Sequence, residues 1–90
     1  MPLSVTELDE AKNSVTALLE ALRLEAYLFE VEPREERWEI RMECATDEGW
    51  MSVTLEIAAN ELEQSRHDPR VRDQLLKAWN TPLAACKRSS

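Results

Sequence analysis

The chain has 90 residues, 11 of them basic and 18 acidic, for a formal net charge of −7. A chain of this length forms one domain, residues 1–90, with a single core and no room for a second domain. The acidic balance disfavours nucleic acid or an anionic membrane as the partner of the whole surface. The charge is uneven, however, because residues 66–90 carry 6 Lys or Arg against 2 Asp or Glu.

The N-terminal sequence MPLSVTELDE is acidic and lacks the basic and apolar regions of a signal peptide. No apolar stretch approaches the roughly 20 residues of a membrane helix. We therefore expect a cytoplasmic protein with no membrane association. In that compartment Cys44 and Cys86 are expected to be reduced and to act as small hydrophobic residues, with a disulfide between them as the less favoured alternative.

Apolar residues recur at three- and four-residue steps over residues 5–24, which predicts an amphipathic helix. Over residues 26–32 the pattern changes to alternation, which predicts a strand with Tyr27, Phe29 and Val31 on one side. Pro33 is expected to close this strand, and residues 33–36 to turn the chain.

The clearest pattern is a β-hairpin over residues 37–57. Apolar and polar residues alternate on both sides of a turn at residues 46–49, which contains Gly49, the single glycine of the chain. A turn centred there aligns four apolar cross-strand pairs on one face. These pairs are Cys44 with Met51, Met42 with Val53, Ile40 with Leu55, and Trp38 with Ile57. Residues 37–45 are then the middle strand of an antiparallel meander.

After residue 57 the pattern becomes helical. Residues 60–63 predict a capped helical turn, and Asp68 with Pro69 predicts the N-cap and first residue of a second main helix. Pro82 must interrupt that helix, and Thr81 is expected to cap a short C-terminal helix that includes Cys86. Residues 87–90 are expected to be a disordered tail.

The predicted fold class is α+β, with two layers in the order α-β-β-β-α. Both main helices cover one face of a three-stranded antiparallel meander, and a short helix follows. This order resembles the topology of the double-stranded RNA-binding domain. RNA binding in that family depends on lysines that open its second helix, whereas residues 68–73 here, DPRVRD, mix acidic and basic side chains. The resemblance therefore concerns the order of elements and implies no RNA-binding site.

No catalytic, metal or cofactor site is predicted. The single histidine, His67, is too close along the chain to Ser65 and Asp68 for the three to converge as a catalytic triad. The candidate metal ligands Cys44, His67, Asp68 and Cys86 lack the paired spacing of zinc sites. We therefore expect neither enzymatic activity nor a bound metal or cofactor.

The solvent-facing side of the hairpin is the predicted working surface. Alternation places Trp50 on this polar side, and an exposed tryptophan is typical of an interface anchor; the alternative is that Trp50 packs over the turn or under the C-terminal segment. The other predicted members of this protein-binding surface are Leu28, Arg37, Glu39, Arg41, Glu43 and Thr54. The strand at residues 50–57 has no proline and one charge, so its edge is expected to pair with a second copy of the chain or with a partner peptide.

Two function classes follow from these patterns. The first is a non-enzymatic cytoplasmic adaptor that binds a protein through this sheet face and edge, with a homodimer as one form. The alternative is a site for nucleic acid or another anionic ligand in the basic C-terminal segment. Its predicted residues are Arg66, Arg70, Arg72 and Lys77, with Lys87 and Arg88 as further cations.

Overall fold

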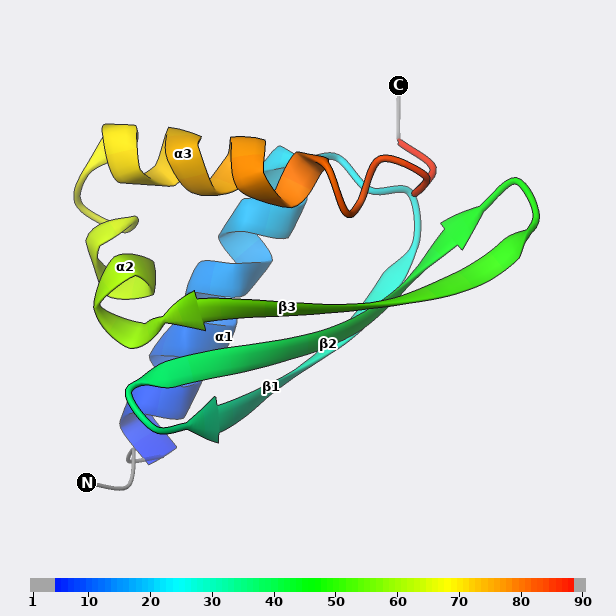
Figure 1. The fold of residues 1–90 in the computed structure, drawn as a ribbon. Helices are drawn as coiled ribbons and strands as arrows, with labels where there is room; N and C mark the ends of the chain where they lie inside the picture. Colours follow the sequence, from blue (N-terminus) through cyan, green and yellow to red (C-terminus); the bar gives the residue numbers. More distant parts are fainter. Residues whose placement is uncertain (1–4, 89–90) are drawn as a thin grey trace.

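The computed structural model describes residues 5–88, which form three helices and a three-stranded antiparallel sheet (Figure 1). In chain order the elements are α1 (Val5–Ala21), β1 (Tyr27–Arg34), β2 (Arg37–Thr46), β3 (Gly49–Ala58), α2 (Ala59–Gln64) and α3 (Pro69–Asn80). The predicted α+β class and the helix-meander-helix order are confirmed. None of the helices in this part of the chain is long and apolar enough to cross a membrane.

The sheet is a meander in which β2 lies between β1 and β3. The predicted register of β2 and β3 is confirmed in every pair, from Cys44 opposite Met51 to Trp38 opposite Ile57. The connecting turn holds because Gly49 adopts a φ of +119°, which favours a residue without a Cβ atom. Because this turn is where alternation predicted it, the inward and outward faces of both strands are also as predicted.

β1 continues past Pro33, which was wrongly expected to close the strand. Pro33 pairs with Trp38, and Arg34 pairs with Arg37. The turn is therefore reduced to residues 35 and 36, with Glu36 at a φ of 56°. Proline is tolerated here because β1 is an edge strand, in which a residue without an N–H group can face away from the ladder.

The helices cover one face of the sheet, and the core lies between the two layers (Figure 1). Residues contributed by the sheet include Trp38, Ile40, Met42, Leu55 and Ile57, and those contributed by the helices include Val15, Leu18, Leu19, Leu62, Leu75 and Trp79. Trp38 is buried, as its place on the apolar face of the hairpin predicted, and Trp79 of α3 is buried as well. The opposite face of the sheet is left uncovered, and the distal part of the β2–β3 hairpin extends beyond the helices (Figure 1).

The segment after α3 differs from the prediction. Residues 81–85 form turns instead of a short helix, and Thr81 has helical backbone angles at the C-cap of α3 instead of capping a new helix. Leu83 and Cys86 are both buried, with exposures of 0% and 3%. The chain therefore bends after Pro82 to bring these two side chains into the core.

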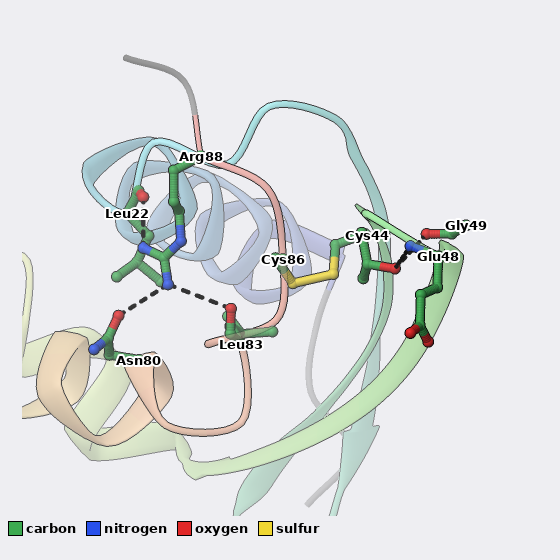
Figure 2. The surroundings of a disulfide bond; sticks show 9 residues. Leu22, Cys44, Glu48, Gly49, Asn80, Leu83, Cys86 and Arg88 are labelled. Atoms are coloured by element: carbon green, nitrogen blue, oxygen red, sulfur yellow. Dashed lines mark hydrogen bonds between the residues drawn. A yellow bond between two sulfur atoms is a disulfide. The ribbon is translucent and has the colours of Figure 1, made fainter.

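Cys86 forms a disulfide with Cys44 of β2, so the prediction of two reduced cysteines was wrong (Figure 2). The hairpin pattern already placed Cys44 on the inward face, where it is fully buried. The two cysteines are 42 residues apart in the chain. Only the path of the segment after α3 brings Cys86 to the distal end of β2.

Residues 86–88 form a C-terminal clasp that continues from the disulfide. The amide of Lys87 donates to the carbonyl of Ala45 at 2.7 Å, and the carbonyl of Lys87 accepts from the amide of Glu25 at 2.8 Å. These bonds join the clasp to both the end of β2 and the connection between α1 and β1. A disordered tail was predicted for residues 87–90, but Lys87 and Arg88 are held by these contacts. Residues 89 and 90 lie outside the described part of the chain.

Arg88 completes the clasp next to the C-terminal end of α1. α1 ends at Ala21, earlier than predicted, and Arg23 takes a φ of 58°. The Arg88 guanidinium donates to the Leu22 carbonyl at 2.8 Å and to Asn80 Oδ1 at 2.9 Å (Figure 2). A cation at the C-terminal end of a helix is favoured by the helix dipole, so Arg88 supports both α1 and the segment after α3.

Candidate protein-binding surface

The outer face of the sheet carries every member of the predicted protein-binding surface. The strand registers arrange these side chains in rows across β1, β2 and β3. The rows are Leu28–Glu43–Ser52, Glu30–Arg41–Thr54, Glu32–Glu39–Glu56 and Arg34–Arg37–Ala58. Trp50 lies opposite Ala45, next to the first of these rows.

Most of the charged side chains on this face pair with one another. We call these six residues the arginine–glutamate network: Glu32, Arg34, Arg37, Glu39, Arg41 and Glu56. Glu39 Oε2 accepts from Arg34 Nη2 at 2.9 Å and from Arg41 Nε at 3.0 Å. Glu32 lies 3.0 and 3.2 Å from the same two guanidinium groups, and Arg37 approaches Glu56 to 3.8 Å. Three carboxylates that would repel one another across one row are thus neutralised by arginines from the rows on either side.

Arg41 is the most strongly engaged cation of the network. Its hydrogen bond to Glu39, followed by the negative charges of Glu32 and Glu39, raises the pKa of Arg41 above its usual value. The charges of Glu39 and Arg41, two members of the predicted surface, are thus already paired with other side chains of the sheet. They are less available for an ion pair with a partner.

The half of the outer face nearest the β2–β3 turn, which we call the distal half, contains more apolar and uncharged side chains than the arginine–glutamate network. Leu28 and Trp50 are 65% and 58% exposed, which makes them the large apolar side chains that this face presents to solvent. Such exposure agrees with the alternation and not with Trp50 packing under the C-terminal segment. Glu43 lies between Leu28 and Ser52 in the register and has no ion-pair partner among residues 5–88.

A shallow open groove of about 550 Å³ runs across this distal half. Its outward-facing lining residues are Leu28, Glu30, Arg41, Glu43, Ser52 and Thr54. We define the distal surface as Leu28, Glu30, Glu43, Trp50, Ser52 and Thr54. It combines exposed apolar area with carboxylates and hydroxyls, which is the composition of a site that can both bury a partner and orient it.

The edge of β3 borders the distal surface. β3 pairs with β2 alone, and within the described residues no other backbone hydrogen bond reaches residues 50–57. On the inner side of this edge, Met51 and Val53 are only half-buried. An added strand could therefore satisfy free backbone groups and cover apolar side chains in one step.

The predicted anionic-ligand residues do not converge on one site. Arg66 lies 3.7 Å from Glu10 and, with Arg72, lines a cleft of about 260 Å³ beside α1. Arg70 borders a separate depression next to His67, and Lys77 lines neither of them. Of the further cations, Arg88 is engaged in the clasp, and Lys87 lies 3.8 Å from Asp47.

The residues weighed for catalysis or metal binding have local structural positions. Asp68 is the N-cap of α3, as predicted, and its Oδ1 accepts from the Arg70 amide at 2.9 Å. His67 is exposed in the connection before it. Within residues 5–88, no three His, Cys, Asp or Glu side chains are grouped so that they could hold a metal ion.

Sequence reasoning missed two members of the distal surface, Glu30 and Ser52. Alternation placed Glu30 on the same side as Leu28, but its row depends on the register between β1 and β2. That register follows from a turn confined to residues 35 and 36. The turn was predicted at residues 33–36, because Pro33 was expected to end the strand. Ser52 gave no signal of its own, because its importance comes from its small size beside Glu43.

Comparisons of the chain with protein-family models, with curated proteins and with solved structures found no match.

Proposed function

We propose that this chain is a non-enzymatic protein-binding or adaptor module that engages its partner through the distal surface and the edge of β3. The observation that carries the proposal is the exposure of Trp50 and Leu28 on one sheet face, next to an unpaired strand edge. Tryptophan is enriched among the residues that dominate binding energy, and a free edge can accept another strand.

Within the predicted surface, the distal half is the better supported part. The arginine–glutamate network already satisfies the charges of Arg37, Glu39 and Arg41. A partner that bound there would have to compete with existing ion pairs. We therefore assign the binding energy to Trp50, Leu28, Glu43 and Thr54, with the network as a rigid support.

One form of the proposal is a homodimer in which residues 50–57 of two copies pair about a two-fold axis. Sedimentation velocity over a wide concentration range tests this form. A reversible monomer–dimer equilibrium that Trp50→Ala shifts towards monomer would support it. A strict monomer at the highest concentration would exclude the homodimer and leave a different protein as the partner.

The compartment is also a proposal. We propose the cytoplasm, as expected from the sequence, whereas a buried disulfide is typical of proteins in oxidising compartments. Alkylation of thiols under denaturing conditions at the moment of cell lysis distinguishes the two, since both cysteines are buried in the folded protein. Modified Cys44 and Cys86 would support the cytoplasm, and protected cysteines would support an oxidising compartment.

The substitution Trp50→Ala tests the proposed function directly. We expect normal stability, because the side chain is mostly in solvent, and at least a tenfold loss of partner affinity, since truncating an interface anchor costs about 2 kcal/mol or more. Affinity capture from the native cell, read by quantitative mass spectrometry, gives the partners for a binding titration.

Val5→Ala is the matched control, because Val5 is 76% exposed on α1, away from the sheet face. It should retain every partner. If Trp50→Ala keeps both the fold and the same partners at the same affinity, the distal surface is not the binding site.

The alternative, binding of nucleic acid or another anion by the basic C-terminal segment, has narrower support. Among its predicted residues, Arg66 and Arg72 line one cleft, and Arg66 is already near Glu10. Titration against RNA and DNA at low salt tests it, because phosphate binding is strongest there. Absence of binding under those conditions would end this alternative.

A further inference from the structure

We infer that the partner is a basic polypeptide segment in an extended conformation, which adds to β3 as a fourth strand and sets an arginine or lysine over Ser52, between Glu43 and Trp50. The inference rests on the proposed function and specifies the chemistry of the partner. It follows from three features of the distal surface: its charge, its shape and the alternation of β3.

The charge of the distal surface indicates that the partner is positively charged. Around Glu43 the cross-strand neighbours are Leu28 and Ser52, neither of which carries charge. The nearest cation along β2 on the same face, Arg41, directs its guanidinium to Glu39 and Glu32. Glu43 therefore presents an unneutralised carboxylate beside exposed apolar side chains, and a cation is its complement.

The shape of the site identifies the length of the side chain. Adjacent strands lie about 4.8 Å apart, so a residue opposite Ser52 on a fourth strand would have its backbone about 10 Å from that of Glu43. Ser52 is small, so it leaves a path between the two. An arginine or lysine side chain is long enough to cross this path and reach the carboxylate, whereas a short polar side chain is not.

Trp50 provides the second contact for that cation. It lies two residues from Ser52 on the same strand and face, and more than half of its surface is exposed. A guanidinium or ammonium group over Ser52 would lie beside the indole ring. Cation–π contact with tryptophan adds to an ion pair and explains why the exposed aromatic residue is next to the free carboxylate.

The alternation of β3 identifies the other residues of the partner. On a fourth strand, the neighbours of the residue opposite Ser52 face inward, beside Met51 and Val53. Both of these side chains are only half-buried. The fitting segment therefore alternates basic residues on its outer side with apolar residues on its inner side.

A second copy of the chain does not meet this requirement. The outward residues of β3 are Trp50, Ser52, Thr54, Glu56 and Ala58, and none of them is a cation. Pairing β3 with its own copy would bring a further carboxylate, Glu56, to the interface and leave Glu43 without a complement. The charge pattern thus favours a different, basic chain.

The test uses two synthetic peptides of about seven residues, long enough to span the distal part of β3. One alternates valine with arginine, and the other alternates valine with glutamine. Binding to the full chain is measured by calorimetry at low salt, and the β3 amides are followed by NMR. We expect the arginine peptide to bind at least tenfold more tightly than the glutamine peptide. The β3 amides that point away from β2 should become protected from hydrogen exchange.

Glu43→Gln provides the decisive variant, and Glu61→Gln on α2 provides a control with the same change in net charge. Glu43→Gln should remove most of the preference for arginine, and Glu61→Gln should retain it. A retained preference in Glu43→Gln would overturn the inference, since the arginine would then bind elsewhere. Equal binding of both peptides at the β3 edge would also overturn it but would support the proposed function.

Two further outcomes separate the inference from the proposal beneath it. If β3 amides are already protected in the free protein and the protein sediments as a dimer, a second copy occupies the edge, and the basic partner is excluded. If neither peptide binds and Trp50→Ala leaves partner capture unchanged, both the inference and the proposed function fail.

Discussion

Glutamates of the same strand have different roles because their cross-strand neighbours differ. Glu39 lies between two acidic residues in its row and is neutralised by Arg34 and Arg41 from the adjacent rows. Glu43, four residues later on the same face, has only uncharged cross-strand neighbours. The first glutamate is therefore engaged within the sheet, whereas the second has no ion pair among residues 5–88 and is the one we propose for partner binding.

Substitution of Glu39 by Gln is expected to lower the free energy of unfolding by about 0.5 kcal/mol, as for other surface ion pairs. The loss arises because Arg34 and Arg41 lose a shared acceptor. It should shrink as salt is added, since salt screens charges at the surface. Urea denaturation at low and high ionic strength measures both effects.

Glu43→Gln is the matched control for this substitution, because it makes the same chemical change on the same strand and face. We expect it to leave the unfolding free energy unchanged. Equal destabilisation by the two substitutions would contradict the distinction between a paired and an unpaired glutamate.

At the scale of the element, the β2–β3 hairpin combines a tight turn with an exposed edge. Thr46 Oγ1 donates to the Gly49 carbonyl at 2.8 Å and accepts from the Glu48 amide at 3.1 Å. These bonds hold the turn that sets the register of the two strands. Because a slip of one residue would move Trp50 and Glu43 to the inner face, the distal surface depends on this turn.

Gly49→Ala should destabilise the protein by about 1 kcal/mol, because a Cβ atom is strained at a φ of +119°. Steric contact is not the cause, since beyond the adjacent residues in the chain no atom lies within 4 Å of the position the new Cβ would occupy. Thermal and urea unfolding would measure the loss. Glu48→Ala in the same turn is the control and should be nearly neutral; a comparable loss there would argue against backbone strain at Gly49.

The two edges of the sheet differ in how they are protected. β1 carries Pro33 together with Glu30 and Glu32, features that discourage the pairing of a further strand. β3 has no proline, and Glu56 near its end is its only charged residue. A partner strand is therefore expected at β3 and not at β1.

At the scale of the whole molecule, the C-terminal clasp anchors the distal hairpin. The molecule measures 41 × 25 × 17 Å along its principal axes, so the hairpin is part of an elongated shape. The disulfide joins Cys44 to Cys86, and the Lys87 amide bonds to Ala45, the residue opposite Trp50. The clasp thus holds the strand on which the distal surface is built.

Removal of the disulfide by the double substitution Cys44→Ala/Cys86→Ala should lower the free energy of unfolding by about 2–4 kcal/mol, because the unfolded chain gains the freedom of a large loop. Denaturation with and without a reducing agent provides the measurement. Reduction should destabilise the native chain and leave the double variant unaffected. Equal stability of the native chain under both conditions would show that the disulfide contributes nothing.

Period-2 alternation and one glycine determined the hairpin, its register and its inward and outward faces, because each depends on residues close together in the chain. Alternation also predicted the exposure of Trp50, and spacing at three- and four-residue steps with the Asp68–Pro69 cap predicted α1 and α3, whereas the predicted short C-terminal helix is replaced by turns. Tertiary structure alone decided the disulfide and the clasp at Arg88, because these join residues whose separation in sequence carries no information about distance. In the arginine–glutamate network, the pairs Glu32–Arg34 and Glu39–Arg41 are neighbours on one strand face, whereas the contacts of Arg34 with Glu39 and of Arg41 with Glu32 depend on the pairing of β1 with β2. Tertiary structure also decided that Glu43 stays unpaired, since a free charge is recognised only when every neighbouring side chain is in place.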